Sequence, residues 1–176
     1  YHTVRLYDQL YMYDAGTYVP CKNKLGAIVR NLVRGIKKNQ LAEVTSYVSD
    51  MSPVKNKVAD AKYIAFNNGI YNIETGELEE FDPSIIITNK IPHNYNYDAY
   101  NEAMDIMLDK VSCNDSQIRD LLEEMAGFCL YRRNELRKAF ILIGDKANGK
   151  STFLDCLVNM VGEDNTSALD LSELKD

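Results

Sequence analysis

The segment that most constrains the fold of this 176-residue chain runs from Gly144 to Thr152 and matches the pattern G-x-x-x-x-G-K-[ST]. An apolar run at residues 139–143 precedes it, and apolar residues at helical spacing follow it as far as Gly162. A buried strand, a glycine-rich loop and a helix in this order are the setting that the pattern requires. We therefore expect the first strand and first helix of an α/β domain here, with the helix ending at Gly162.

The residue types of this loop predict its chemistry. Glycines let the backbone bend sharply and bring several N–H groups onto one polyphosphate without a Cβ in the way. We expect Lys150, as the catalytic residue, to neutralise the β and γ phosphates, and the Ser151 hydroxyl to coordinate Mg²⁺. A structural turn that matches the pattern by chance is the alternative. The sequence thus predicts a site for ATP and Mg²⁺ formed by Gly144, Asp145, Lys146, Ala147, Asn148, Gly149, Lys150, Ser151 and Thr152.

The first third of the chain predicts a hairpin followed by two helices. Apolar and polar residues alternate over residues 4–20 around the turn signal Asp14-Ala15-Gly16. Apolar residues then recur at helical spacing over residues 25–36. A second helix, capped by Asn39 and closed by Pro53, is expected to have an apolar face of Leu41, Val44, Tyr47, Val48 and Met51.

The pattern changes to a period of two in the middle of the chain. Residues 63–66, 70–73 and 77–81 are separated by turn signals and predict a β-meander. Residues 85–88 predict one more strand, and residues 91–97 an extended connector.

Two helices are expected after this connector. The first has an apolar face of Tyr100, Ala103, Met104, Met107, Leu108 and Val111, and the second begins with Asn114 and Gln117 at the spacing of a capping box. We place the main boundary near residues 137–139. The expected domains are a hairpin and helical unit at 1–60, a β-meander and helical region at 61–138, and the start of the P-loop domain at 139–176.

Composition excludes several classes of protein. A formal net charge of −6 argues against a nucleic-acid coat protein. The four cysteines form no C-x-x-C pair, and neither histidine has a partner at metal spacing, so we expect no disulfide framework and no zinc site. No apolar run is long enough to span a membrane and the first residues lack a targeting pattern, so a cytoplasmic protein is expected.

A local basic cluster contrasts with the acidic total. Six basic residues and no acidic residue lie between Cys21 and Gln40. On a helix, four of them would share the face opposite the apolar stripe, as a surface that follows DNA phosphates requires. A solvated or inter-subunit surface is the alternative. These four candidate DNA-binding residues, here called the basic cluster, are Arg30, Arg34, Lys37 and Lys38.

Several blocks of the chain resemble the superfamily 3 helicase module of phage and plasmid primase-helicases, a group that includes the poxvirus primase-helicase. Residues 66–78, from Phe66-Asn67-Asn68-Gly69 to Glu77-Leu78, are similar to the turn-strand-turn signature ahead of that helicase. Residues 88–92 with Tyr95, the helix containing Gly127-Phe128, and Asn148-Gly149-Lys150-Ser151-Thr152-Phe153 also fit the group. Lys146 departs from it, because a small residue is more common there. The likeness is good over residues 63–176 and loose over residues 1–53.

The resemblance implies an α+β accessory region followed by the first strand and helix of an AAA+ type P-loop NTPase. It also implies an ATP-dependent DNA helicase for phage or plasmid replication that acts as a homo-oligomeric ring, expected to be a hexamer, on DNA. Hydrolysis also needs an acidic residue at a strand end, a polar sensor and an arginine. Asp170, Glu173 and Asp176 lack the apolar strand that would deliver such a carboxylate, so we expect an inactive front fragment of a longer enzyme. Another P-loop NTPase, such as a small-molecule kinase, and a non-catalytic DNA-binding or assembly module are the alternatives.

Overall fold

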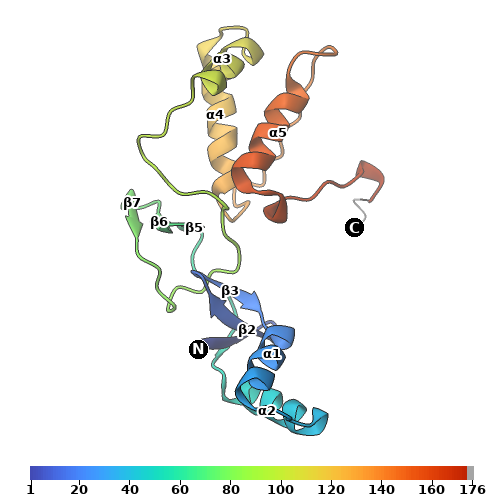
Figure 1. The fold of residues 1–176 in the computed structure, drawn as a ribbon. Coiled ribbons are helices and arrows are strands. Elements are labelled where there is room, and N and C mark those ends of the chain that lie inside the picture. The colour runs from blue at the N-terminus through green and yellow to red at the C-terminus, as the bar shows by residue number, and fades with distance from the viewer. Residues whose placement is uncertain (174–176) are drawn as a thin grey trace. The chain divides into compact units, whose positions relative to one another are not determined.

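A computed structural model describes residues 1–173 and has an α+β architecture with two sheets and five α-helices in that range (Figure 1). It forms two compact units. Unit 1 comprises Tyr1–Asp60 and Glu80–Asn89, and unit 2 comprises Ala61–Glu79 and the chain from Lys90 onward. The three domains expected from the sequence remain a prediction, and the compact units group the residues differently. No helix among the described residues is long and apolar enough to cross a membrane.

The sheet of unit 1 has the order β3-β2-β1-β4. Strand β2 (Gln9–Asp14) pairs antiparallel with β1 (Thr3–Leu6) and β3 (Thr17–Pro20), whereas β4 (Val54–Lys55) runs parallel to β1. Ala15 and Gly16 form the predicted turn with φ of 45° and 98°, the left-handed values of a tight hairpin turn. The hairpin prediction is confirmed, and β1 extends it by a strand.

Two helices follow in unit 1, α1 (Lys22–Leu32) and α2 (Lys38–Met51). The prediction of one helix over residues 25–36 is wrong at its end, because Val33 is extended and Gly35 has a φ of 79°. Asn39 lies inside α2 rather than at its cap. Side chains of α1 pack with β2 in a core of Met12, Cys21, Leu25 and Val29, while α2 has no buried residue.

The expected strand at residues 85–88 is absent from the described structure, although Ile86 and Ile87 are buried. The Ile86 carbonyl accepts a bond from the Ala59 N–H (2.8 Å), and the Ile87 carbonyl one from the Tyr18 N–H (2.7 Å). Isolated bonds to two different segments do not make a ladder, so the buried isoleucines pack without forming a strand.

Unit 2 begins with the predicted meander, which is confirmed in the order β5-β6-β7. The strands are β5 (Tyr63–Phe66), β6 (Gly69–Asn72) and β7 (Glu77–Glu79), all antiparallel. Ile64 and Phe66 of β5 share a core with Ile91 and with Val161, so this sheet packs near the end of the last α-helix.

The rest of unit 2 contains α3 (Glu102–Val111), α4 (Ser116–Leu130), α5 (Lys150–Val161) and two short 3₁₀ turns, Glu163–Asn165 and Leu171–Glu173. The cap of α4 is Asp115 and not Asn114, because its carboxylate accepts bonds from two N–H groups, at 2.9 and 3.2 Å. Asp170 lies in an irregular segment and Glu173 in the last 3₁₀ turn, whereas Asp176 lies outside the described residues.

Candidate functional site

Helix α5 is held in place by the core of unit 2. Phe153 is fully buried and packs with Leu157 of the same helix against Leu108 of α3 and Leu122 and Met125 of α4. Apolar residues at positions 153, 157 and 161 lie about one helical turn apart, so they form one buried face. This packing fixes the start of α5 relative to α3 and α4.

An ion-pair network joins α3 to α4 in the same unit. The Arg119 guanidinium donates to Asp105, to Asp109 and to Glu123, the last at 2.9 Å. Hydrogen bonds from Arg119 and from the Tyr100 hydroxyl lower the pKa of Asp105 from its ordinary value. Three carboxylates from two helices therefore share one guanidinium, which ties the helices that support α5.

The phosphate loop, residues 144–149, leads directly into α5 and contains two glycines, Gly144 and Gly149. Gly149 is the N-cap with a φ of 87°, a left-handed conformation that favours glycine. A Cβ on Gly144 would lie 2.2 Å from Nδ2 of Asn148. The backbone therefore favours glycine at position 149, whereas a Cβ at position 144 would require the Asn148 side chain to move.

The first turn of α5 offers unpaired backbone donors. Phe153 N–H makes the first intrahelical bond, to the Gly149 carbonyl at 2.9 Å. The N–H groups of residues 150–152 therefore have no acceptor within the helix, and they carry the positive end of its dipole. They border a hollow of about 200 Å³ lined by Ala147, Asn148, Gly149, Lys150, Ser151 and Thr152.

The Lys150 side chain folds back over the loop. Its Nζ donates to the carbonyls of Gly144 (2.9 Å) and Asp145 (2.7 Å) and to Oδ1 of Asn148 (2.7 Å). An ammonium group has three donors, so all of them are used. A polyphosphate at this site would exchange some of these neutral acceptors for anionic oxygens, which form stronger bonds with a cation.

The structure places the other predicted residues of the loop at its exposed surface. Ser151 and Thr152 are exposed on the first turn of α5, and Asp145 and Lys146 are exposed in the loop itself. Asp145, Ser151 and Thr152 all have side-chain oxygens, which hard cations such as Mg²⁺ prefer. Ser151 is the expected ligand because it follows the lysine of the pattern. These nine residues form one continuous segment, and their roles in binding remain predictions.

The strand expected before the loop is not formed. Residues 139–143 have no strand assignment, and Ile141 and Ile143 are 81% and 89% exposed. A strand requires a neighbour to bond with, and neither sheet in the described range includes this segment. Leu142 packs against the α3–α5 core and Phe140 stacks edge-on with Phe128 at 5.9 Å, so the run is anchored by side chains alone.

Unit 1 carries the basic cluster. All four residues are exposed, but α1 ends at Leu32, so they do not share one helical face as expected. Arg30 lies in the last turn of α1, Arg34 and Lys37 in the connection, and Lys38 at the start of α2. Arg30 and Lys38 nevertheless line the same hollow between the two helices. The turn between α1 and α2 thus brings basic residues of both helices close together. Spacing along a single helix could not predict this.

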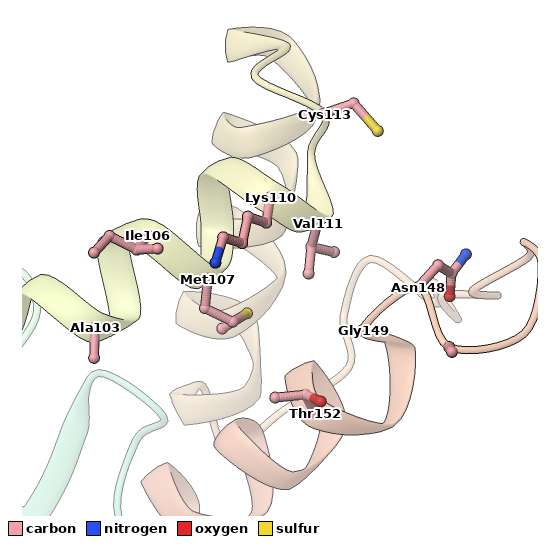
Figure 2. Close-up of a pocket in the computed structure, with 10 residues that line it drawn as sticks. Ala103, Ile106, Met107, Lys110, Val111, Cys113, Asn148, Gly149 and Thr152 are labelled. Atoms are coloured by element: carbon pink, nitrogen blue, oxygen red, sulfur yellow. The ribbon is translucent and has the colours of Figure 1, made fainter.

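An apolar surface of α3 borders the phosphate loop, and the sequence alone did not predict this contact. Val111 of α3 lies against Gly149, since a Cβ on that glycine would be 2.7 Å from Cγ2 of Val111. Figure 2 shows Val111 and Met107 of α3 on the side facing Gly149 and Thr152. One sign of this surface was present in the sequence, because Ile106 is apolar but lies outside the apolar face predicted for the α3 segment.

A family model described as D5 N terminal like matches residues 12–129, which is more than half of the chain and ends before the phosphate loop. The match includes most of residues 1–53, over which the resemblance in sequence is loose. A search of curated proteins finds no match.

Proposed function

Because this chain belongs to the D5 N-terminal-like family, which is typical of phage and plasmid primase-helicases, we propose that it forms part of an ATP-dependent DNA helicase of that kind. In this proposal residues 144–152 bind the triphosphate of ATP, and a longer parent protein couples hydrolysis to unwinding. The parent acts as a homo-oligomeric ring, with six subunits expected.

One observation carries the proposal. Unpaired N–H groups at the start of α5, the Lys150 ammonium and a left-handed Gly149 converge on one small hollow. Backbone donors, a helix dipole and a cation at one point are the features that bind phosphate groups. The buried face of α5 supports them, because it holds the first turn of the helix against α3 and α4.

Each residue of the loop has a distinct task in this proposal. The amides of the first turn hold β-phosphate oxygens, and the Lys150 ammonium neutralises charge at the β and γ phosphates. The Ser151 hydroxyl would hold Mg²⁺, which neutralises the developing charge when it is bound. Gly144 leaves room for the Asn148 carboxamide, which keeps Lys150 directed over the loop.

Turnover requires groups in addition to these. A carboxylate and a polar group must position the attacking water, and an arginine finger is worth about 10³–10⁵ in rate. We therefore propose that this chain binds ATP without hydrolysing it at a significant rate, and that the parent supplies the other groups.

In this proposal the basic cluster contacts DNA. Its four cations are exposed, and none forms an ion pair within residues 1–173. By contrast, Lys24, which is also in this region, pairs with Asp14. Exposed and unpaired cations can exchange their counterions for DNA phosphates, which gives binding a strong dependence on salt.

The test is ATP hydrolysis by the parent protein with and without single-stranded DNA, for the natural sequence and for Lys150→Ala. We expect DNA-stimulated hydrolysis that the substitution abolishes, while far-ultraviolet circular dichroism of the two proteins stays the same. Equal rates for the two proteins would refute the assignment of the catalytic loop. Hydrolysis that DNA does not stimulate would favour another kind of P-loop NTPase.

A further inference from the structure

A cavity of about 500 Å³ adjoins the phosphate loop on the side of α3 (Figure 2). It is distinct from the small hollow at the start of α5, although four residues border both: Ala147, Asn148, Gly149 and Thr152. Its size is within the range of about 300–1,000 Å³ that is usual for small-molecule sites. The residues that line it are Ala103, Ile106, Met107, Lys110, Val111, Cys113, Ala147, Asn148, Gly149 and Thr152.

We propose that this cavity holds the base of a nucleoside triphosphate whose phosphates bind at residues 144–152. The inference rests on the proposed function and adds to it the part of the site that recognises the nucleoside. In this arrangement α3 contributes a wall for the base, and the loop with α5 contributes the phosphate site.

The lining has the chemistry that a flat aromatic ring requires. Ile106, Met107 and Val111 contribute aliphatic and thioether surface from two adjacent turns of α3. Ile106 is 46% exposed, so its apolar side chain is accessible to a ligand in the cavity. Burying a base against this surface removes apolar area from water at about 25 cal/mol per Å².

The position of the cavity identifies the base as its occupant. Val111 touches the site of a Cβ on Gly149, so the apolar wall begins where the phosphate loop ends. Thr152, on the first turn of α5, lies on the border of both hollows. A ligand that fills both hollows would have an anionic part at the phosphate loop and a largely apolar part against α3, as a nucleotide has.

The polar groups of the lining are few and set the expected selectivity. Lys110 brings a charge to this lining, and its ammonium forms no ion pair within residues 1–173. Oδ1 of Asn148 is already bonded to Lys150. Specificity among bases needs several fixed donors and acceptors. This cavity should therefore favour a nucleoside triphosphate over plain triphosphate, with little preference between ATP and GTP.

The test compares ATP with inorganic tripolyphosphate, which lacks the base. The full 176-residue chain is titrated with each ligand in Mg²⁺ by isothermal calorimetry. Ala103 is exposed on α3, so Ala103→Trp fills the cavity without changing the core. Glu124→Trp is the matched control, because Glu124 is exposed on α4 and does not line the cavity.

We expect Ala103→Trp to weaken ATP binding by about tenfold or more and to change tripolyphosphate binding by less than about twofold. Ile106→Ala removes apolar surface without adding bulk, so it should weaken ATP binding by about threefold to tenfold and leave tripolyphosphate binding unchanged. It provides the test if the tryptophan variant fails to fold. Glu124→Trp should leave both affinities unchanged.

The other outcomes separate this inference from the proposed function. Suppose that the natural chain binds ATP and tripolyphosphate, and that Ala103→Trp and Ile106→Ala bind ATP as tightly as the natural chain. The base then does not lie in this cavity, and the inference fails while the proposed function stands. If the natural chain binds neither ligand, the phosphate site itself is wrong and both proposals fall.

Discussion

Replacing Gly149 by alanine tests whether the phosphate loop has the backbone and the neighbour described above. Gly149 has a φ of 87°, which costs any residue with a Cβ about 1–2 kcal/mol. The added Cβ would also lie 2.7 Å from Cγ2 of Val111, well inside contact distance. Overpacking of this kind typically costs about 1–3 kcal/mol, because either α3 or the loop must move.

The two costs can be separated with a double-mutant cycle. Gly149→Ala alone should lower the free energy of unfolding by about 2–5 kcal/mol. Adding Val111→Ala removes the methyl groups that the new Cβ meets, so the steric part disappears and the conformational part remains. The double variant should then be more stable than the sum of the single effects predicts, by about 1–3 kcal/mol.

Urea unfolding followed by circular dichroism measures all four proteins of the cycle. Gly127→Ala is the control, because Gly127 lies inside α4 and a Cβ added there would have nothing within 4 Å beyond its own helix and chain neighbours. That substitution should stabilise the chain by about 0.5–1 kcal/mol, since alanine favours a helix over glycine. The reasoning is refuted if Gly149→Ala is as harmless as Gly127→Ala, or if the cycle shows no coupling between positions 111 and 149.

Three further predictions concern the helix pair, the basic cluster and the assembly. Because the pKa of Asp105 is lowered in the folded chain, its ion pair with Arg119 stabilises the fold above the unfolded pKa, and this stabilisation is lost as pH falls through the folded pKa. In urea unfolding, the difference in stability between the natural chain and Arg119→Met should therefore be smaller below about pH 4 than at pH 7. A difference that does not change with pH would contradict this. Charge reversal of Arg30, Arg34 and Lys37 together should weaken DNA binding by the parent and flatten its dependence on salt, and an unchanged salt slope would exclude this surface. Sedimentation should find this chain mainly monomeric and the parent in a ring with ATP and DNA, so a stable hexamer of the chain or a strictly monomeric parent would be evidence against it.

Local signals predicted the elements that depend on neighbouring residues. The turn at Ala15-Gly16 and the meander of residues 63–79 follow from turn residues and a period of two, and both are present. The end of α5 at Gly162 was also predictable, because a left-handed glycine (φ 91°) closes a helix wherever the rest of the chain lies.

The errors fall where distant segments decide the outcome. An apolar run at residues 139–143 forms a strand only when another strand pairs with it, and no periodicity reveals that partner. Ile86 and Ile87 are buried, but the bonds to their carbonyls come from two separate segments. The apolar wall beside Gly149 depends on the packing of α3, so the loop's own residues contain no sign of it.

Nuclear magnetic resonance of this chain during titration with Mg²⁺ and tripolyphosphate tests the central claim most directly. The phosphate-loop account predicts that the backbone amide signals of residues 147–152 shift first and most, and that Lys150→Ala weakens the titration without moving signals of the α3–α4 core. The account is contradicted if those amides stay unchanged at saturating ligand, or if the largest shifts occur in unit 1.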